Sequence, residues 1–133
     1  AGALSVKLKH LNEWTRQRQE IAKHYNESLK EIGDVVLPEV HTDSTHVYHL
    51  YVIKTKDRDG LQKHLFKNGI GTLIHYPIPP YLQSAYTSLG FKKGSFPIAE
   101  DLADSSLSLP IWPGMTQGEV NYVAENIINY WKY

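Results

Sequence analysis

Residues 46–55 read HVYHLYVIKT, a run in which β-branched and aromatic residues outnumber all others. A run that is nearly continuous in apolar character is typical of a strand covered on both faces. We therefore expect residues 46–55 to form the central strand of the fold. Most of the rings of Tyr48, His49 and Tyr51 are expected to pack in the core, each with its polar group satisfied.

Shorter strand patterns lie on both sides of this run along the chain. Residues 35–40 are a candidate edge strand, and residues 70–76 (IGTLIHY) are a further strand that ends at Pro77. Residues 106–109 (SLSL) form a short strand stopped by Pro110, because proline has no N–H to donate to a ladder. Together with the central strand they predict a small sheet of three or four strands.

Helix signals separate these strands. Asp57 is a candidate N-cap of a helix that ends at 68–69, and Pro97 suits the first turn of another. Thr116 and Glu119 form a capping box that opens a last helix. The order of elements predicts an α+β fold: a small antiparallel or mixed sheet with helices packed on one face.

A long amphipathic helix is predicted over residues 3–32, with Gly33 as its stop. Its apolar residues recur at three- and four-residue steps: Leu4, Leu8, Leu11, Trp14, Ile21, Tyr25, Leu29 and Ile32. Such a helix is about 45 Å long, whereas a compact chain of this size is only about 36 Å across. We expect residues 1–33 to connect a body of residues 34–133 to a further domain outside the chain. A helix that protrudes or pairs in a dimer is the alternative.

Composition excludes several classes of protein. The 133 residues carry 14 basic and 14 acidic side chains, which argues against a nucleic-acid binder. The chain has no Cys, which excludes a disulfide scaffold, a zinc–thiolate site and a cysteine nucleophile. No apolar run approaches the roughly 20 residues of a membrane span, and no signal peptide is recognisable. We expect a cytoplasmic protein that does not contact a membrane.

Two motifs suggest a ligand but are set aside. Residues 68–71 (NGIG) lack the third glycine of a dinucleotide loop and follow a helix instead of preceding one. His46 and His49 lie three apart in the predicted strand, so they should point to opposite faces and not share a metal ion. The segment 75–83 (HYPIPPYLQ) remains: prolines hold a His and a Tyr at a strand end. It is either a ligand-contacting edge or a rigid surface turn.

Four runs of the sequence resemble those of a known family. The runs that carry the resemblance are VKLKHLNEW (6–14), THVYHLYVIKTKDRDGLQKHL (45–65), NGIGTLIHYPIPPYLQSAY (68–86) and GSFPIAEDLADSSLSLPIWPGMT (94–116). They are similar to the C-terminal part of the DegT/DnrJ/EryC1/StrS family, pyridoxal-phosphate-dependent aminotransferases of nucleotide-linked keto sugars. The resemblance covers essentially the whole chain, and residues 71–83 are its most specific segment.

The resemblance implies a small C-terminal domain of a fold-type I enzyme, placed after a long connecting helix. It implies that pyridoxal phosphate and its Schiff-base lysine belong to a large domain outside the chain, so no catalytic or cofactor-binding residue is expected here. The expected substrate is a dTDP-3-keto-6-deoxyhexose, with glutamate as amino donor. A homodimer is expected for the full-length enzyme, in amino-sugar or polysaccharide biosynthesis, whereas the isolated chain is expected to be inactive.

The resemblance also names substrate-binding residues. His75 matches the family's His at the edge of the substrate pocket, and Tyr76 follows it. Tyr81 stands where the family often has His, so an ionic role is not expected there. No metal ligand is implied. The alternative is a non-catalytic regulatory or ligand-binding member of the family, and a lysine in the upstream Schiff-base position would distinguish the two.

Overall fold

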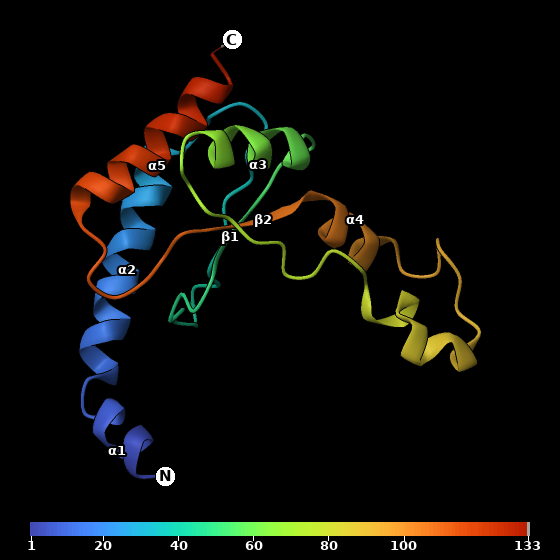
Figure 1. Cartoon of the computed structure of the whole chain (residues 1–133), viewed down its shortest axis with the longest axis horizontal. Coiled ribbons are helices and arrows are strands. Elements are labelled where there is room, and N and C mark those ends of the chain that lie inside the picture. Colours follow the sequence, from blue (N-terminus) through green and yellow to red (C-terminus); the bar gives the residue numbers. More distant parts are fainter. Residues whose placement is uncertain (133) are drawn as a thin grey trace.

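The computed structural model describes residues 1–132, and at its centre is a two-stranded antiparallel sheet (Figure 1). Strand β1 (Tyr51–Lys54) pairs with β2 (Ser106–Leu109), with Tyr51 opposite Leu109. Isolated bridges flank this pair: Val36 bonds to β1 and Leu73 bonds to β2. The fold is therefore α+β, as predicted, with a sheet narrower than expected.

The strand at 106–109 is confirmed, but the other three predicted strands were too long. Residues 46–50 lie outside β1, because Tyr48 adopts a positive φ of 46° that an extended strand does not allow. The segment 35–40 keeps only the bridge at Val36, since Pro38 has no N–H for the ladder. Likewise β2 ends at Pro110, so the segment 70–76 pairs with it only at Leu73.

Three helices enclose the core: α2 (Leu11–Ser28), α3 (Arg58–Lys67) and α5 (Gln117–Tyr130). Helix α5 contacts both α2 and α3. The largest fully buried side chains come from the helices and both strands: Tyr25, Tyr51, Leu29, Ile53, Leu61, Leu65, Leu107, Ile127 and Val120. Tyr51 and Tyr48 pack in this core as predicted, whereas His49 is exposed.

The predicted continuous helix over residues 3–32 is wrong in two respects: it is interrupted at residues 9–10 and it ends at Ser28. The chain forms a separate helix α1 (Gly2–Leu8) and turns at residues 9–10 before α2 begins. No residue of α1 is buried, so no packing aligns it with α2. Helix α2 ends at Ser28, and it does not continue to residue 32 because Glu31 has a left-handed φ of 61°. Gly33 follows with a φ of 54°, and a Cβ on it would lie 2.3 Å from the Trp131 indole ring. No helix within residues 1–132 is both long and apolar enough to cross a lipid bilayer.

The predicted helix caps are confirmed. The Asp57 carboxylate accepts a hydrogen bond from the Gly60 N–H at 3.2 Å, and Pro97 lies in the first turn of α4 (Pro97–Ser105). The Thr116 hydroxyl accepts from the Glu119 N–H, and the Glu119 carboxylate accepts from the Thr116 N–H at 2.7 Å. These caps depend on residues three apart at most, which is why the sequence alone reveals them.

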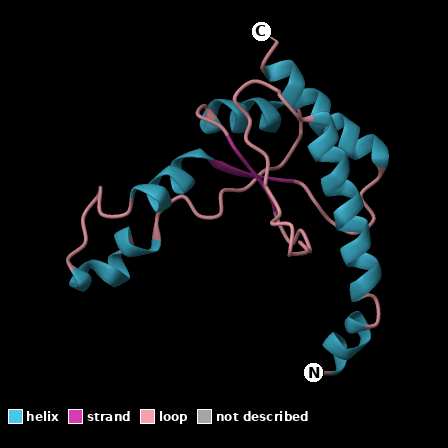
Figure 2. Ribbon diagram, turned by 180° about the vertical axis from the view of Figure 1, so that it is seen from behind, coloured by secondary structure: helices cyan, strands magenta, loops and turns pink. Residues whose placement is uncertain are grey.

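Residues 76–105 form an arm that projects from the sheet (Figures 1 and 2). The arm contains the 3₁₀ helices η1 (Pro80–Leu82) and η2 (Ser84–Leu89), followed by α4. Within it only Pro79 and Ala103 are buried. We call the rest of the chain from α2 onward, residues 11–75 and 106–132, the body.

Candidate functional site

His75 lies where the chain leaves the sheet to enter the arm. Two residues earlier, the Leu73 N–H and C=O are bonded to the main chain of Ser108 in β2, at 3.3 and 2.8 Å. This pairing brings the His75 ring to the Ser108 side chain, with 2.9 Å between Nδ1 and Oγ. The sheet therefore fixes the position of the imidazole, which is itself half-buried.

A cavity of about 190 Å³ opens beside this histidine. Its walls come from three segments: His49, Leu50, Gly71, Thr72, Leu73, His75, Ser108, Leu109, Pro110 and Ile111. Sequence reasoning missed His49 and Ser108. His49 was grouped with Tyr48 and Tyr51 as a ring of the predicted strand, which was too long, and nothing local to Ser108 points to a residue 33 positions earlier.

Tyr76 accompanies His75 at the base of the arm. The two rings meet edge to face with centroids 5.6 Å apart, and the peptide bond between them is cis. Tyr76 is 70% exposed, so both its ring face and its hydroxyl are open to a ligand or a partner. The structure thus brings two of the three predicted substrate-binding residues together.

Tyr81 lies apart from them, within the arm. Its ring packs edge-on against Phe96 and Phe91, with centroids 4.8 and 6.4 Å away, and its hydroxyl donates to the Glu100 carboxylate. None of the residues that line the His75 cavity belongs to the arm. Partial burial and the nearby Glu100 carboxylate raise the pKa of Tyr81 to about 12.

Glu100 joins three parts of the arm. Besides Tyr81, its Oε1 accepts from the Gly94 N–H at 2.7 Å and from the Phe96 N–H at 3.4 Å. The hydrogen bond from Tyr81, followed by these N–H groups, lowers the pKa of Glu100 despite some burial. We call this arrangement of Tyr81, Glu100 and the 92–96 turn the clasp. Sequence reasoning assigned no role to Glu100.

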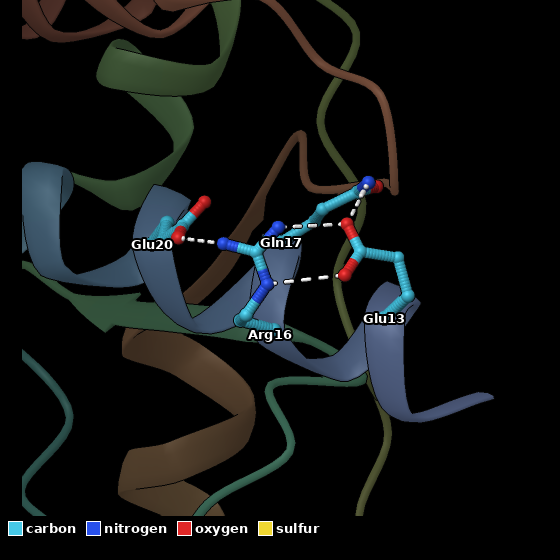
Figure 3. Close-up of polar contacts among 4 residues, drawn as sticks. All are labelled: Glu13, Arg16, Gln17 and Glu20. Carbon is cyan, nitrogen blue, oxygen red and sulfur yellow. Dashed lines mark hydrogen bonds and ion pairs between the residues drawn. The ribbon is translucent and has the colours of Figure 1, made fainter. Parts of the chain in front are cut away.

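A second polar group of residues lies on α2 (Figure 3). The Arg16 guanidinium donates to Glu13 at 2.8 and 3.1 Å and also to Glu20, while Gln17 donates to Glu13 at 2.8 Å. All four residues lie on one helix at three- or four-residue steps, and the Arg16 and Glu13 side chains are 59% and 50% exposed. Exposed ion pairs at this spacing are typical of a solvated helix face.

The residues of this chain do not fit a pyridoxal phosphate site. Such a site needs a lysine that bonds to the aldehyde carbon and an acidic residue that faces the pyridine nitrogen. None of the lysines in residues 1–132 is buried, and the half-buried Lys54 is bound to Asp101 at 2.5 Å. Lys63 and Lys67 line a separate cavity that contains no carboxylate. The described residues also hold no cluster of three or more potential metal ligands.

Comparison with known proteins identifies the family. The DegT/DnrJ/EryC1/StrS aminotransferase family matches residues 1–128, so the chain belongs to it. The predicted resemblance is confirmed.

Individual relatives share most of this chain. It is 45% identical over 92% of its length to the erythromycin biosynthesis sensory transduction protein EryC1 of Saccharopolyspora erythraea, and covers 34% of that protein. It is 42% identical over 98% of its length to dTDP-3-amino-3,6-dideoxy-alpha-D-galactopyranose transaminase of Aneurinibacillus thermoaerophilus, and covers 35% of it. The chain thus spans about a third of the length of these curated relatives.

A solved structure shares the fold closely. The crystal structure of Streptomyces venezuelae DesV, in complex with a ketimine intermediate, superposes with a TM-score of 0.95 at 34% identity. The match covers 98% of this chain and 35% of DesV. The arrangement of sheet, helices and arm is therefore that of the corresponding part of DesV.

Proposed function

We propose that this chain is the C-terminal small domain, residues 1–133, of a pyridoxal-phosphate-dependent aminotransferase that acts on a nucleotide-linked keto sugar. The close superposition on DesV carries this proposal. It is supported by relatives named dTDP-amino-sugar transaminases at 42% and 36% identity. Because residues 1–132 do not fit the cofactor, the proposal assigns pyridoxal phosphate to a large domain outside the chain.

The finer substrate is part of the same proposal. A dTDP-3-keto-6-deoxyhexose as substrate agrees with the name of the Aneurinibacillus relative. Glutamate is the amino donor in this proposal. His75 and Tyr76 are the proposed contacts to the sugar nucleotide, because His75 lines the cavity and the adjacent Tyr76 is 70% exposed. Tyr81 is retained as a third contact that only accepts, since its O–H already donates to Glu100.

A homodimer in the cytoplasm completes the proposal. Large apolar side chains stand exposed on α1 and on the arm, where Leu4 is 72% and Ile98 is 80% exposed. Exposed apolar surface of this extent marks interaction sites. Leu4 and Leu8 on α1, with Leu11 at the start of α2, would face the large domain or a second subunit.

The test is single-turnover kinetics of each half-reaction in the full-length enzyme carrying His75→Ala. A hydrogen bond to a neutral group contributes about 0.5–1.5 kcal/mol and one to a charged group about 1.5–3. The keto-sugar half-reaction should therefore lose roughly 3- to 100-fold in kcat/KM, while the amino-donor half-reaction changes less. His41→Ala, at an exposed loop histidine, is the control. Equal losses in both half-reactions, or none, would remove His75 from the substrate site.

A second candidate function has support from names alone. EryC1 is called a sensory transduction protein, and a relative from Geobacillus stearothermophilus, 41% identical over the whole of this chain, is called a pleiotropic regulatory protein. A regulatory member would bind its ligand without turnover. Formation of amino sugar from keto sugar and glutamate by the full-length protein distinguishes the two, because only the enzyme releases a product for each glutamate consumed.

A further inference from the structure

Ser108 is the only side chain within residues 1–132 that hydrogen-bonds to His75. It is 5% exposed, and its main-chain N–H and C=O are both used by Leu73. The hydroxyl group has no other hydrogen-bond partner among the described residues. Its proton therefore has one acceptor within reach, the Nδ1 atom of His75.

This geometry determines which imidazole nitrogen carries the proton. A buried hydroxyl proton without a partner is costly, so the stable arrangement has Ser108 donating to Nδ1. A neutral imidazole that accepts at one nitrogen carries its proton on the other. Neutral His75 then has its N–H at Nε2, the atom that no described residue bonds.

We propose that Ser108 is a positioning residue that holds His75 in the Nε2–H tautomer, so that the cavity offers an N–H donor to a ligand oxygen. The tautomer part of the proposal rests on the geometry of residues 73–108 alone. The ligand part rests on the function proposed above, and it narrows the group met by His75 to one that accepts a hydrogen bond, such as a sugar hydroxyl or a phosphate oxygen. The Ser108 hydroxyl does not touch the ligand in this arrangement.

The first measurement needs no substitution at Ser108. In protein labelled with ¹⁵N in histidine side chains, long-range ¹H–¹⁵N correlation spectra in mildly alkaline solution distinguish protonated from unprotonated ring nitrogens. His75→Asn identifies the His75 signals among the seven histidines. We expect an unprotonated Nδ1 and a protonated Nε2. A proton on Nδ1 of His75 overturns the proposal, whatever the enzyme's activity.

The second measurement removes the hydroxyl. In Ser108→Ala the ratio of the two tautomers should shift toward Nδ1–H by roughly 2- to 12-fold, the equivalent of one neutral hydrogen bond. Ser108→Thr keeps the hydroxyl and should restore the ratio. Ser106→Ala is the matched control, since Ser106 is equally buried two residues earlier in β2 but does not touch a histidine. An unchanged ratio in folded Ser108→Ala contradicts the proposal.

Activity then separates this inference from the proposed function. If both hold, Ser108→Ala lowers kcat/KM in the keto-sugar half-reaction, by less than His75→Ala does, and Ser108→Thr recovers it. A shifted tautomer with unchanged kinetics retains the positioning role but overturns the ligand part. If the proposed role of His75 in substrate binding is wrong, His75→Ala leaves kcat/KM of the keto-sugar half-reaction unchanged.

Discussion

The body and the arm both contain helices, but different forces hold their helices in place. In the body, apolar side chains from α2, α3, α5 and both strands are fully buried together. In the arm, 28 of 30 residues (76–105) are not buried, and its shape depends on the clasp and a small cluster of aromatic rings. The body owes its stability to burial, whereas the arm owes its conformation to a few polar bonds.

The proposed substrate contacts lie where these two regions meet. His75 is held by the body through Ser108, and Tyr76 is the first residue of the arm. A side chain held by a rigid sheet keeps one position. A side chain on a loosely packed segment can move to fit a ligand. The chain thus places one proposed contact against the sheet and the other on the arm.

The largest contrast should come from the same substitution made in each region. Ile53 in β1 is 0% exposed and Ile98 in α4 is 80% exposed. Ile53→Ala should lower the free energy of unfolding by about 2–5 kcal/mol through lost burial and a cavity. Ile98→Ala should change it by less than about 0.5 kcal/mol. Urea denaturation followed by circular dichroism measures both, and similar losses would contradict the division into body and arm.

Two glycine substitutions within the body should change the free energy of unfolding in opposite directions. Gly33 has a φ of +54° with the Trp131 ring against it, so Gly33→Ala should cost at least about 1–2 kcal/mol. Gly118, in the first turn of α5, has open space where a Cβ would be added. Gly118→Ala should gain up to about 1 kcal/mol because alanine favours the helix. Melting temperatures report both signs, and a neutral Gly33→Ala would show that Trp131 does not pack closely there.

These contrasts also explain how far sequence reasoning reached. The Asp57 cap, the Thr116–Glu119 capping box and the 106–109 strand were predictable because their determinants lie within a few residues. The lengths of the other strands were not predictable, because they depend on pairing with distant segments: β1 and Leu73 pair with β2, and Val36 pairs with Lys54 in β1.

The candidate site was also only partly predictable from the sequence. His75 and Tyr76 stand out through neighbouring prolines and the family motif, but their surroundings do not. The bond from Ser108 to His75 crosses 33 positions, and that from Tyr81 to Glu100 crosses 19. Charge and apolar periodicity carry no signal for such pairs, so the sequence does not reveal the partners of Ser108 and Glu100.

A third prediction concerns the clasp. Glu100→Ala removes the acceptor shared by Tyr81, Gly94 and Phe96, so the 92–96 turn should loosen while the body keeps its stability. Trypsin should then cleave after Lys92 or Lys93 several-fold faster, with an unchanged urea midpoint. Asp104→Ala, an exposed acid on the same helix, is the control. Equal cleavage rates in both variants would show that the clasp does not hold the turn.

A smaller change in the stability of the arm should appear when the pH is varied. The pKa of Tyr81 is raised from 10.0 to about 12, so its contribution to arm stability is fully present below pH 10 and is lost as pH rises through about 12. The lowered pKa of Glu100 gives the opposite dependence: its contribution is present above its ordinary pKa of 4.5 and is lost in more acidic solution. Titration of ¹³C-labelled tyrosine, assigned with Tyr81→Phe, follows the alkaline step. In Glu100→Ala the pKa of Tyr81 should fall toward 10, and no change would contradict the pairing.

Native-state hydrogen exchange of the 133-residue chain tests the distinction between body and arm most directly. Helices α4 and α5 both have hydrogen-bonded amides, but only α5 is packed against the core. Amides of α4 should exchange through local openings of low free energy that are insensitive to denaturant, whereas those of α5 should exchange only on global unfolding. If α4 and α5 instead share one opening free energy and one denaturant dependence, the arm is part of the cooperative core and the account is wrong.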